Sequence, residues 1–294
     1  MSIRGVHSTS RQLIRAFVAR TTRTGDEVAY ALQSRSFTWA GSQGLFAAIL
    51  AKLRIVSTTP KIALVAGGSG LVGGYLIQAL LEAPEYARVF ALTRRPLGRD
   101  HHKLANRIVV FERMAEQLKG MTAHEAFCCI GTTRAAAGSD EAFREADLDA
   151  VLLFARAARA TGASRFVVVS SVGADSNSKK LYLRTKGEME EAVATVGFTS
   201  LDILQPSLLL GPRNELRPLE LAGRVLAPLV NPLLTGTRES LRAIPAETVA
   251  RAMIGASRRG GRGIYRYTYA AIRQLSELKL NQPLSTQSPK KGPA

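Results

Sequence analysis

The chain has 294 residues, of which 46% are hydrophobic and 21% charged, and this ordinary composition excludes a wholly disordered, collagen-like or coiled-coil protein. It contains no apolar run long enough to span a membrane. Its two cysteines, Cys128 and Cys129, are neighbours, which excludes a disulfide framework and leaves no spacing typical of a metal site. The net charge of +17 is uneven: the first 60 residues hold eight basic residues and two acidic ones. No cluster of basic and aromatic residues indicates a nucleic-acid partner.

The first 24 residues are rich in arginine, serine and threonine and contain no acidic residue. This composition is typical of a mitochondrial transit segment, and the apolar core of a secretory signal is missing. We therefore expect residues 1–58 to be a basic leader that directs the protein to the mitochondrion. The alternative is an extension of no consequence. The apolar stretch 45–55 could lie on a membrane surface as an amphipathic helix, or it could pack on the domain that follows.

From Lys61 onward, short apolar runs alternate with helical patterns. We expect strands at 62–66, 88–92, 107–111, 126–130, 166–169 and 200–204, and helices at 71–82, 141–161 and 186–196. This alternation predicts parallel βαβ units, and hence a Rossmann-type, doubly wound α/β sheet within residues 59–280. Residues 213–260 mix helical patterns with prolines, so a small substrate lobe is expected from about Gly211. Residues 281–294 are expected to be a disordered tail.

The clearest motif is a glycine-rich turn between the first strand and the first helix. Its glycines form a GxxGxxG pattern in the strand–turn–helix context that dinucleotide binding requires. Such glycines allow a tight turn, close approach of the backbone to a pyrophosphate and close packing of helix on strand, and the helix N-terminus offers N–H groups to phosphate. The expected cofactor-binding residues here are Gly67, Ser69, Gly70, Leu71, Val72 and Gly73. The alternative is a turn that serves packing alone.

The end of the second strand indicates which nicotinamide cofactor is preferred. An NAD site usually has an acidic residue there, which binds the ribose 2′-hydroxyl. This chain has Arg94 and Arg95 instead, and guanidinium groups pair well with the additional phosphate of NADP. The sequence therefore predicts NADP(H) in preference to NAD(H), unless the two arginines belong only to a solvated turn.

A second group of polar residues follows the fifth strand. Ser170 and Ser171 end this strand at the carboxyl edge of the sheet, where ligands bind. Tyr182 and Lys186 are four residues apart, so on a helix they share one face. The pKa of a free tyrosine is about 10, but a nearby ammonium group favours the phenolate. Tyr182 could then donate a proton to a carbonyl oxygen while a serine orients that oxygen. The alternative is a core tyrosine and a solvated lysine.

Together these segments resemble an atypical short-chain dehydrogenase/reductase, most closely the Tat-interactive-protein-like oxidoreductases, which include a mitochondrial fungal branch. The resemblance covers about residues 61–275 and rests on five blocks in the family's order: Gly67–Gly73, Cys128–Thr133, Ser170–Asp175, Tyr182–Glu188 and Ile203–Gly211. It implies an NADP(H)-binding Rossmann domain.

The resemblance also implies roles for individual residues. Tyr182 would be the acid/base, and Lys186 would be its partner and a ribose ligand. Ser171 would be the catalytic serine, with Ser170 as the alternative. The residues implied beside the cofactor are Gly131, Thr132, Pro206 and Ser207. The family often has an aspartate after the third strand, where this chain has Val110-Phe111-Glu112, so the contact to the adenine stays unassigned.

The sequence thus predicts an NADP(H)-dependent oxidoreductase acting on a small carbonyl or alcohol substrate, with catalytic Ser171, Tyr182 and Lys186 and no metal. The alternative is a non-catalytic NAD(P)H-binding accessory subunit of a mitochondrial assembly such as respiratory complex I, which the leader and the basic chain ends would suit. A small-molecule substrate and no nucleic acid are expected as partners. Association with a membrane surface or a large complex, the oligomeric state and the identity of the substrate stay open.

Overall fold

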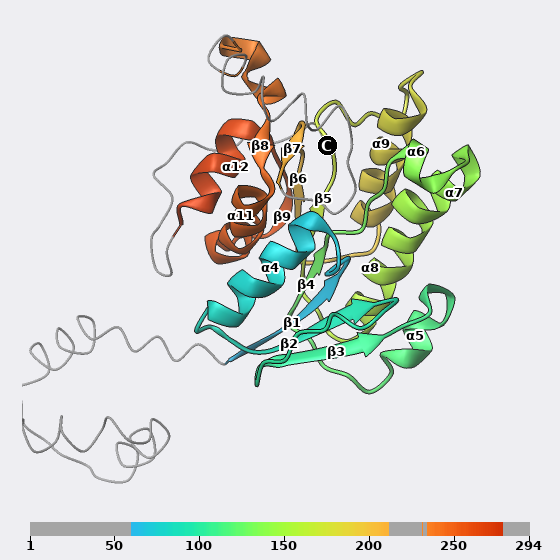
Figure 1. Ribbon diagram of the computed structural model, residues 1–294, viewed down its shortest axis with the longest axis vertical. Helices are drawn as coiled ribbons and strands as arrows, with labels where there is room; N and C mark the ends of the chain where they lie inside the picture. Colours follow the sequence, from blue (N-terminus) through green and yellow to red (C-terminus); the bar gives the residue numbers. More distant parts are fainter. Residues whose placement is uncertain (1–59, 212–230, 232–233, 279–294) are drawn as a thin grey trace, which may run out of the picture. The chain divides into compact units, whose positions relative to one another are not determined.

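The computed structural model describes residues 60–211, 231 and 234–278, and its sheet and helices are shown in Figure 1. The chain divides between Ser57 and Thr58, and every described residue belongs to the second unit. The predicted leader and the predicted tail from 281 lie outside the described residues. None of the described helices has the length and apolar character needed to span a membrane.

Seven parallel strands form the main sheet. They are β1 (Lys61–Ala66), β2 (Tyr86–Thr93), β3 (Leu104–Ile108), β4 (Glu125–Cys128), β5 (Arg165–Val169), β6 (Ser200–Leu204) and β9 (Gly263–Tyr267). Their order is β3-β2-β1-β4-β5-β6-β9, which confirms the predicted doubly wound sheet of the Rossmann type. The order reverses between β1 and β4, and ligands of open α/β sheets bind outside the carboxyl ends of strands at such a reversal.

Helices cover both faces of the sheet. On one face lie α4 (Leu71–Glu82), α11 (Ala246–Arg259) and α12 (Tyr269–Ser276), and on the other lie α8 (Ala150–Ala160) and α9 (Leu181–Ala194) (Figure 1). Alternate residues of β1 serve the two layers: Ala63 and Val65 belong to the apolar cluster with α4 and α11, and Leu64 and Ala66 to the cluster with α8. A strand covered on both faces needs a continuous apolar run, which is why β1 was readable from the sequence.

Several predicted elements are confirmed with shifted ends. The strand at 200–204 is β6 as predicted, whereas β3 begins three residues before the predicted 107–111. β3 is an edge strand with exposed residues, so it carries no apolar run to mark its bounds. The helix predicted at 186–196 begins earlier, at Leu181, and therefore contains both Tyr182 and Lys186.

The predicted helix 141–161 is a continuous helical segment with a wider turn inside it. It consists of α7 (Asp140–Arg144), a π-helical turn η2 (Glu145–Asp149) and α8. Phe143 precedes this turn and Asp147 lies within it, and both side chains are fully buried against residues of α9. Such π-helical turns are frequent at functional sites because they redirect side chains.

The predicted substrate lobe is corrected from Ala246 onward. Instead of belonging to a separate lobe, α11 packs against α4, and β9 extends the sheet beside β6. Pro245 stands just before α11, where a missing N–H costs no helical hydrogen bond, so this proline marks a helix start rather than an irregular lobe. A small separate sheet pairs β7 (Leu209–Leu210) with β8 (Ile244–Pro245). The rest of the predicted lobe, 212–230 and 232–233, lies outside the described residues.

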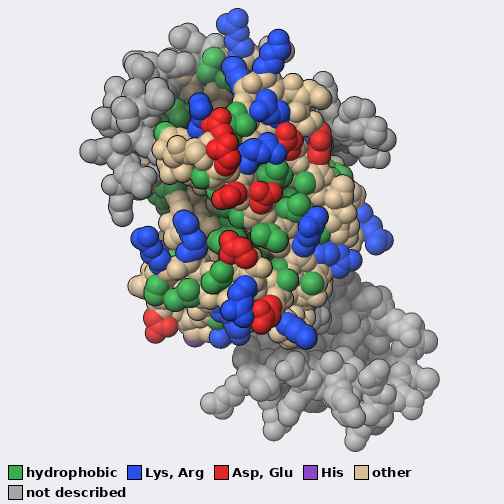
Figure 2. Space-filling view, turned by 90° about the vertical axis from the view of Figure 1, so that its right-hand side faces the viewer, with side chains coloured by type: hydrophobic (Ala, Val, Ile, Leu, Met, Phe, Trp, Pro, Cys, Tyr) green, Lys and Arg blue, Asp and Glu red, His purple; other side chains and the backbone are tan. Residues whose placement is uncertain are grey.

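Charges of both signs share the helical face seen in Figure 2. Acidic side chains gather over its middle and basic side chains lie around them. On the helices of this side, Arg144 of α7 lies 2.6 Å from Glu188 of α9, and Arg184 lies 3.9 Å from the same carboxylate. The positive net charge of the sequence is therefore not concentrated on this face.

Glu125 forms a buried cluster at the amino ends of the strands, away from the carboxyl edge. Lys61 Nζ lies 2.7 Å from Glu125 Oε1, Ser257 donates to Oε2 at 2.6 Å, and the Tyr86 hydroxyl also donates to Oε2. Burial, the largest influence, raises the pKa of Glu125, but Lys61, Ser257 and Tyr86 together lower it below its ordinary value of 4.5. The cluster thus ties three strands to α11 around an ionised carboxylate.

Acid is expected to weaken the fold through this cluster. A carboxyl whose folded pKa is lowered stabilises the fold above its unfolded pKa, and this contribution is lost as the pH falls through the folded value. Glu125→Gln should therefore lower the Tm at neutral pH and flatten its fall below the ordinary pKa of 4.5. Thermal unfolding over the acid range tests this, with the exposed Glu112→Gln as control. If the Tm of Glu125→Gln fell with acid as steeply as that of the unaltered protein, the stabilising role given to Glu125 would be wrong.

Candidate active site

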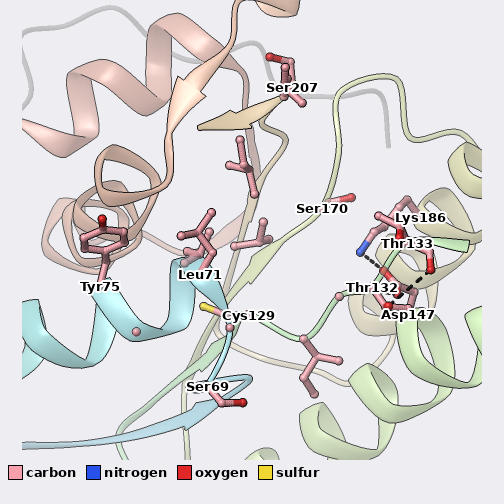
Figure 3. A pocket seen from close by; sticks show the side chains of 18 of the residues that line it. Ser69, Leu71, Tyr75, Cys129, Thr132, Thr133, Asp147, Ser170, Lys186 and Ser207 are labelled. Carbon is pink, nitrogen blue, oxygen red and sulfur yellow. Dashed lines mark hydrogen bonds and ion pairs between the residues drawn. The ribbon is translucent and has the colours of Figure 1, made fainter. Parts of the chain in front are cut away.

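A cavity of about 700 Å³ opens at the carboxyl ends of the central strands. It runs from the glycine turn and the start of α4, past the loop after β4, to α9 and β7. Of the predicted site residues, it is lined by Ser69, Gly70, Leu71, Val72, Gly131, Thr132, Ser170, Tyr182, Lys186 and Ser207. Figure 3 shows Leu71 and Tyr75 on the α4 side and Lys186 on the opposite side, pointing toward Asp147. One cavity therefore joins the two predicted motifs.

The glycine turn has the shape that a pyrophosphate requires. Gly67 has a φ of +78°, and a Cβ there would lie 2.5 Å from the backbone carbon of Cys129. A Cβ on Gly73 would lie 2.1 Å from the carbonyl oxygen of Gly67. Among the described residues, no side chain caps α4, so none competes for its first N–H groups. These observations fit a dinucleotide whose phosphates approach the backbone at the helix N-terminus.

The loop after β2 places a third arginine near the cavity. Arg94 and Arg95 are exposed and do not line the cavity, whereas Arg99 does. Asn106 of β3 shapes this loop: its side chain donates to Thr93 Oγ1 at 2.7 Å and accepts from the N–H of Leu97 at 2.8 Å. Arg99 was missed in the sequence because it follows a proline and a glycine in a segment without periodicity.

Tyr182 and Lys186 lie on one face of α9, as their spacing predicts. The Tyr182 side chain is 38% exposed at the cavity, and its ring stacks on buried Phe143, with the ring centres 5.7 Å apart. Lys186 is almost fully buried, at 3% exposure. A tyrosine held by stacking beside a buried cation has the arrangement that proton transfer to a ligand requires.

Of the two serines, the structure favours Ser170 over Ser171. Ser170 lines the cavity, and its hydroxyl donates to Glu190 Oε1 at 2.6 Å. Ser171 does not line the cavity, and its hydroxyl has only a long contact of 3.4 Å with the carbonyl oxygen of Val172. Successive side chains of an extended segment point to opposite sides, so only one of two adjacent serines can face the cavity.

Glu190 is a buried carboxylate that sequence reasoning missed. It accepts hydrogen bonds from Ser170, from Gln205 Nε2 at 2.8 Å and from Arg266 Nε at 2.8 Å. A carboxylate paired with an arginine accepts hydrogen bonds, so the Ser170 hydroxyl donates its proton to Glu190. Its place four residues after Lys186, on the same helix face, was the available signal.

Asp147 is the second missed carboxylate. Its Oδ1 lies 2.5 Å from Lys186 Nζ, and its Oδ2 accepts the N–H of Thr132 at 2.7 Å (Figure 3). Burial, the largest influence, lowers the pKa of Lys186, but Asp147 and Tyr182 raise it above its ordinary value. In the sequence Asp147 stands among other acidic residues of a helix, and nothing there separates it from a solvated side chain.

Of the predicted residues after β6, Ser207 lines the cavity and Pro206 lies beside it. Pro206 is buried, and its carbonyl accepts the N–H of Val172 at 3.0 Å. The Ser207 hydroxyl donates to the carbonyl oxygen of Arg242. Cys129 lines the cavity, and burial raises its pKa well above its ordinary value, which makes the thiol unreactive. Within the described part of the chain, no group of histidine, cysteine or acidic side chains is arranged to hold a metal ion.

Comparisons with known proteins agree with this geometry. A model of the NAD dependent epimerase/dehydratase family matches residues 63–241. Protein HTATIP2 of Rattus norvegicus is 36% identical over 199 residues, which are 66% of this chain and 80% of that protein. The mitochondrial protein fmp52 of Aspergillus clavatus is 34% identical over 197 residues, which are 65% of this chain and 84% of that protein. These relatives confirm the resemblance to the Tat-interactive-protein-like group, and the fungal names agree with the predicted mitochondrial location.

Solved structures share the fold at low identity. The Bordetella bronchiseptica enzyme WbmH in complex with NAD+ has a TM-score of 0.54 and 16% identity, over 74% of this chain and 79% of that one. UDP-glucose 4-epimerase of Thermotoga maritima with UDP-glucose has a TM-score of 0.53 and 15% identity, over 79% and 87% of the two chains. With the family model covering more than half of its length, this chain belongs to the NAD dependent epimerase/dehydratase family and has its NAD(P)-binding, oxidoreductase-type fold.

Proposed function

We propose that this protein is an NADP(H)-dependent oxidoreductase that interconverts a small carbonyl compound and its alcohol in the mitochondrion. The observation that carries the proposal is the single cavity that joins the glycine turn to Tyr182, Lys186 and Ser170. The names of the fungal relatives support the location. When bound, the reduced cofactor would supply a hydride to the carbonyl carbon.

Tyr182 would donate its hydroxyl proton to the carbonyl oxygen in the reductive direction and take it back in the oxidative direction. Stacking on Phe143 limits the movement of its ring, and the buried ammonium of Lys186 stabilises the phenolate that proton donation leaves. Solvent returns the proton at the exposed edge of the ring.

Ser170 would have a different role from that of a serine that orients a carbonyl oxygen by donating a hydrogen bond to it. Its proton is committed to Glu190, so its oxygen offers lone pairs to the cavity and accepts a hydrogen bond from the substrate. Tyr182 is then the hydroxyl that donates to the reacting oxygen. This arrangement favours a substrate that has a hydroxyl or amide N–H near its carbonyl group.

The loop after β2 supports the choice of NADP(H). Arg94 and Arg95 follow the strand where an NAD site has an acidic residue, and Arg99 lines the cavity. A charge-assisted hydrogen bond contributes about 1.5–3 kcal/mol. NADPH is therefore expected to bind roughly 10–150-fold more tightly than NADH.

A fluorescence titration of both cofactors into the full chain tests this preference. Arg99→Ala and the double variant Arg94→Ala/Arg95→Ala should weaken NADPH binding and leave NADH binding unchanged. Arg251→Ala, which removes an exposed arginine of α11, is the matched control. Equal affinities for the two cofactors would refute the role given to the arginines.

The same titration, combined with a turnover assay and a test of co-migration, separates the proposed enzyme from the accessory subunit. Cofactor binding together with turnover of a carbonyl substrate supports the enzyme. Cofactor binding without turnover, combined with co-migration of the native protein with a large complex, would favour the accessory subunit. Failure to bind either cofactor would refute the proposed function.

A further inference from the structure

Asp147 contacts two walls of the cavity, one formed by α9 and the other by the loop after β4. One oxygen lies 2.5 Å from Lys186 Nζ, and the other accepts the N–H of Thr132 at 2.7 Å. The carboxylate thereby connects α9 to the loop after β4. Asp147 lies in the π-helical turn η2, and Phe143, which stacks on Tyr182, precedes this turn.

Gly131, in the loop after β4, lies against this ion pair and has no side chain. A Cβ on Gly131 would lie 3.5 Å from Asp147 Oδ1 and 3.6 Å from Lys186 Nζ. The absence of a side chain at this position lets a ligand in the cavity reach the ammonium group. Asp147 is fully buried, and a buried carboxylate requires a partner of opposite charge.

The charges around Lys186 come from three elements. Asp147 faces it from η2, Tyr182 from its own helix and Cys128 from β4. Burial raises the pKa of Cys128 to about 12, so this thiol is neutral. Of the carboxylates that follow Lys186 on α9, Glu188 is paired with Arg144 and Glu190 with Arg266. Among the described residues, Asp147 is therefore the negative charge that offsets the ammonium of Lys186.

We propose that Asp147 is a positioning residue that holds Lys186 in place and offsets its charge, so that Tyr182 acts chiefly as a proton donor. This inference rests on the proposed function. An unopposed ammonium would favour the phenolate, which is the base that alcohol oxidation needs. With Asp147 beside the ammonium, this effect is offset, which favours Tyr182 as the proton donor of carbonyl reduction.

Asp147→Asn tests the proposal with little change in shape. The amide oxygen can still accept the N–H of Thr132, but the negative charge is lost. Tyr182 in this variant is expected to ionise about 1–3 pH units lower than in the unaltered protein, because its neighbouring ammonium is no longer offset. Ultraviolet difference absorbance of the full chain during a pH titration measures the ionisation, and the same chain carrying Tyr182→Phe isolates this one phenol.

Asp149→Asn is the matched control, since Asp149 lies in the same turn and is exposed. It should leave the ionisation of Tyr182 unchanged. An unchanged ionisation in Asp147→Asn would overturn the proposal. The measurement of Tyr182 ionisation requires no substrate, so its result does not depend on turnover. A failure of turnover would count against the proposed function instead.

A second comparison covers the case in which Asp147→Asn does not fold. Lys186→Met leaves the carboxylate without its partner, whereas Asp147→Asn/Lys186→Met removes both charges together. Tyr182 should ionise at lower pH in the double variant than in Lys186→Met, because only the single variant keeps the negative charge nearby. Ionisation at the same pH in both variants would overturn the charge-offsetting role.

Discussion

Tyr182→Phe is expected to lower turnover by roughly 10²–10⁴-fold while leaving NADPH affinity almost unchanged. The substitution removes the hydroxyl that donates the proton but keeps the ring stacked on Phe143, so the cavity retains its shape. Lys186 remains paired with Asp147, and the glycine turn is not touched. Turnover with a carbonyl substrate and fluorescence titration of NADPH, measured on the same preparation, test the prediction.

Tyr265→Phe is the matched control for this experiment. Tyr265 lies on β9, and its hydroxyl donates to the carbonyl oxygen of Arg262 at 2.8 Å, outside the cavity. This variant should keep full turnover. If Tyr182→Phe also kept full turnover, Tyr182 could not be the proton donor, and the proposed function would lose its central residue.

Asp202→Ala is expected to destabilise the fold by about 3–5 kcal/mol, the cost of leaving a buried charge without its partner. Asp202 is fully buried in β6. Its carboxylate accepts from Arg165 Nη1 at 2.5 Å, from Arg259 Nη2 at 3.2 Å and from the Tyr267 hydroxyl at 2.8 Å. Burial and the charge of Asp202 raise the pKa of Tyr267, which keeps this hydroxyl a donor.

Denaturant unfolding followed by circular dichroism measures this loss, with the exposed Asp149→Ala as control. Asp202 and its three partners, Arg165, Arg259 and Tyr267, do not line the cavity. The folded fraction of Asp202→Ala should therefore still bind NADPH. A loss of stability below about 1 kcal/mol would show that the two arginines find other partners or water.

Much of the fold was readable because its signals are local. The apolar run of β1, the glycine turn and the helical periodicity of α4 each depend on residues close together in the chain. Edge strands and amphipathic segments were harder, because solvent tolerates polar residues there. For this reason β3 was displaced, and β9 and α11 were missed as members of the sheet and its covering layer.

The site residues divide in the same way. Tyr182 and Lys186 were identified from their spacing, and both line the cavity, whereas the predicted serine, Ser171, does not and its alternative, Ser170, does. The choice of Ser170 over Ser171 depended on which side of the chain faces the cavity. Two neighbouring serines in a sequence do not reveal this. Glu190 was missed although it follows Lys186 by four residues.

The sequence by itself determined the class of the fold, the place of the phosphate-binding turn and the residue types of the proton-transfer group, because these follow from periodicity and from short spacings. Only the tertiary structure decided which charges act on that group. Asp147 and Glu190 come to Lys186 and Ser170 from different elements, across 39 and 20 positions of the chain respectively. An electrostatic interaction depends on distance in space and on burial, and neither is encoded in local sequence.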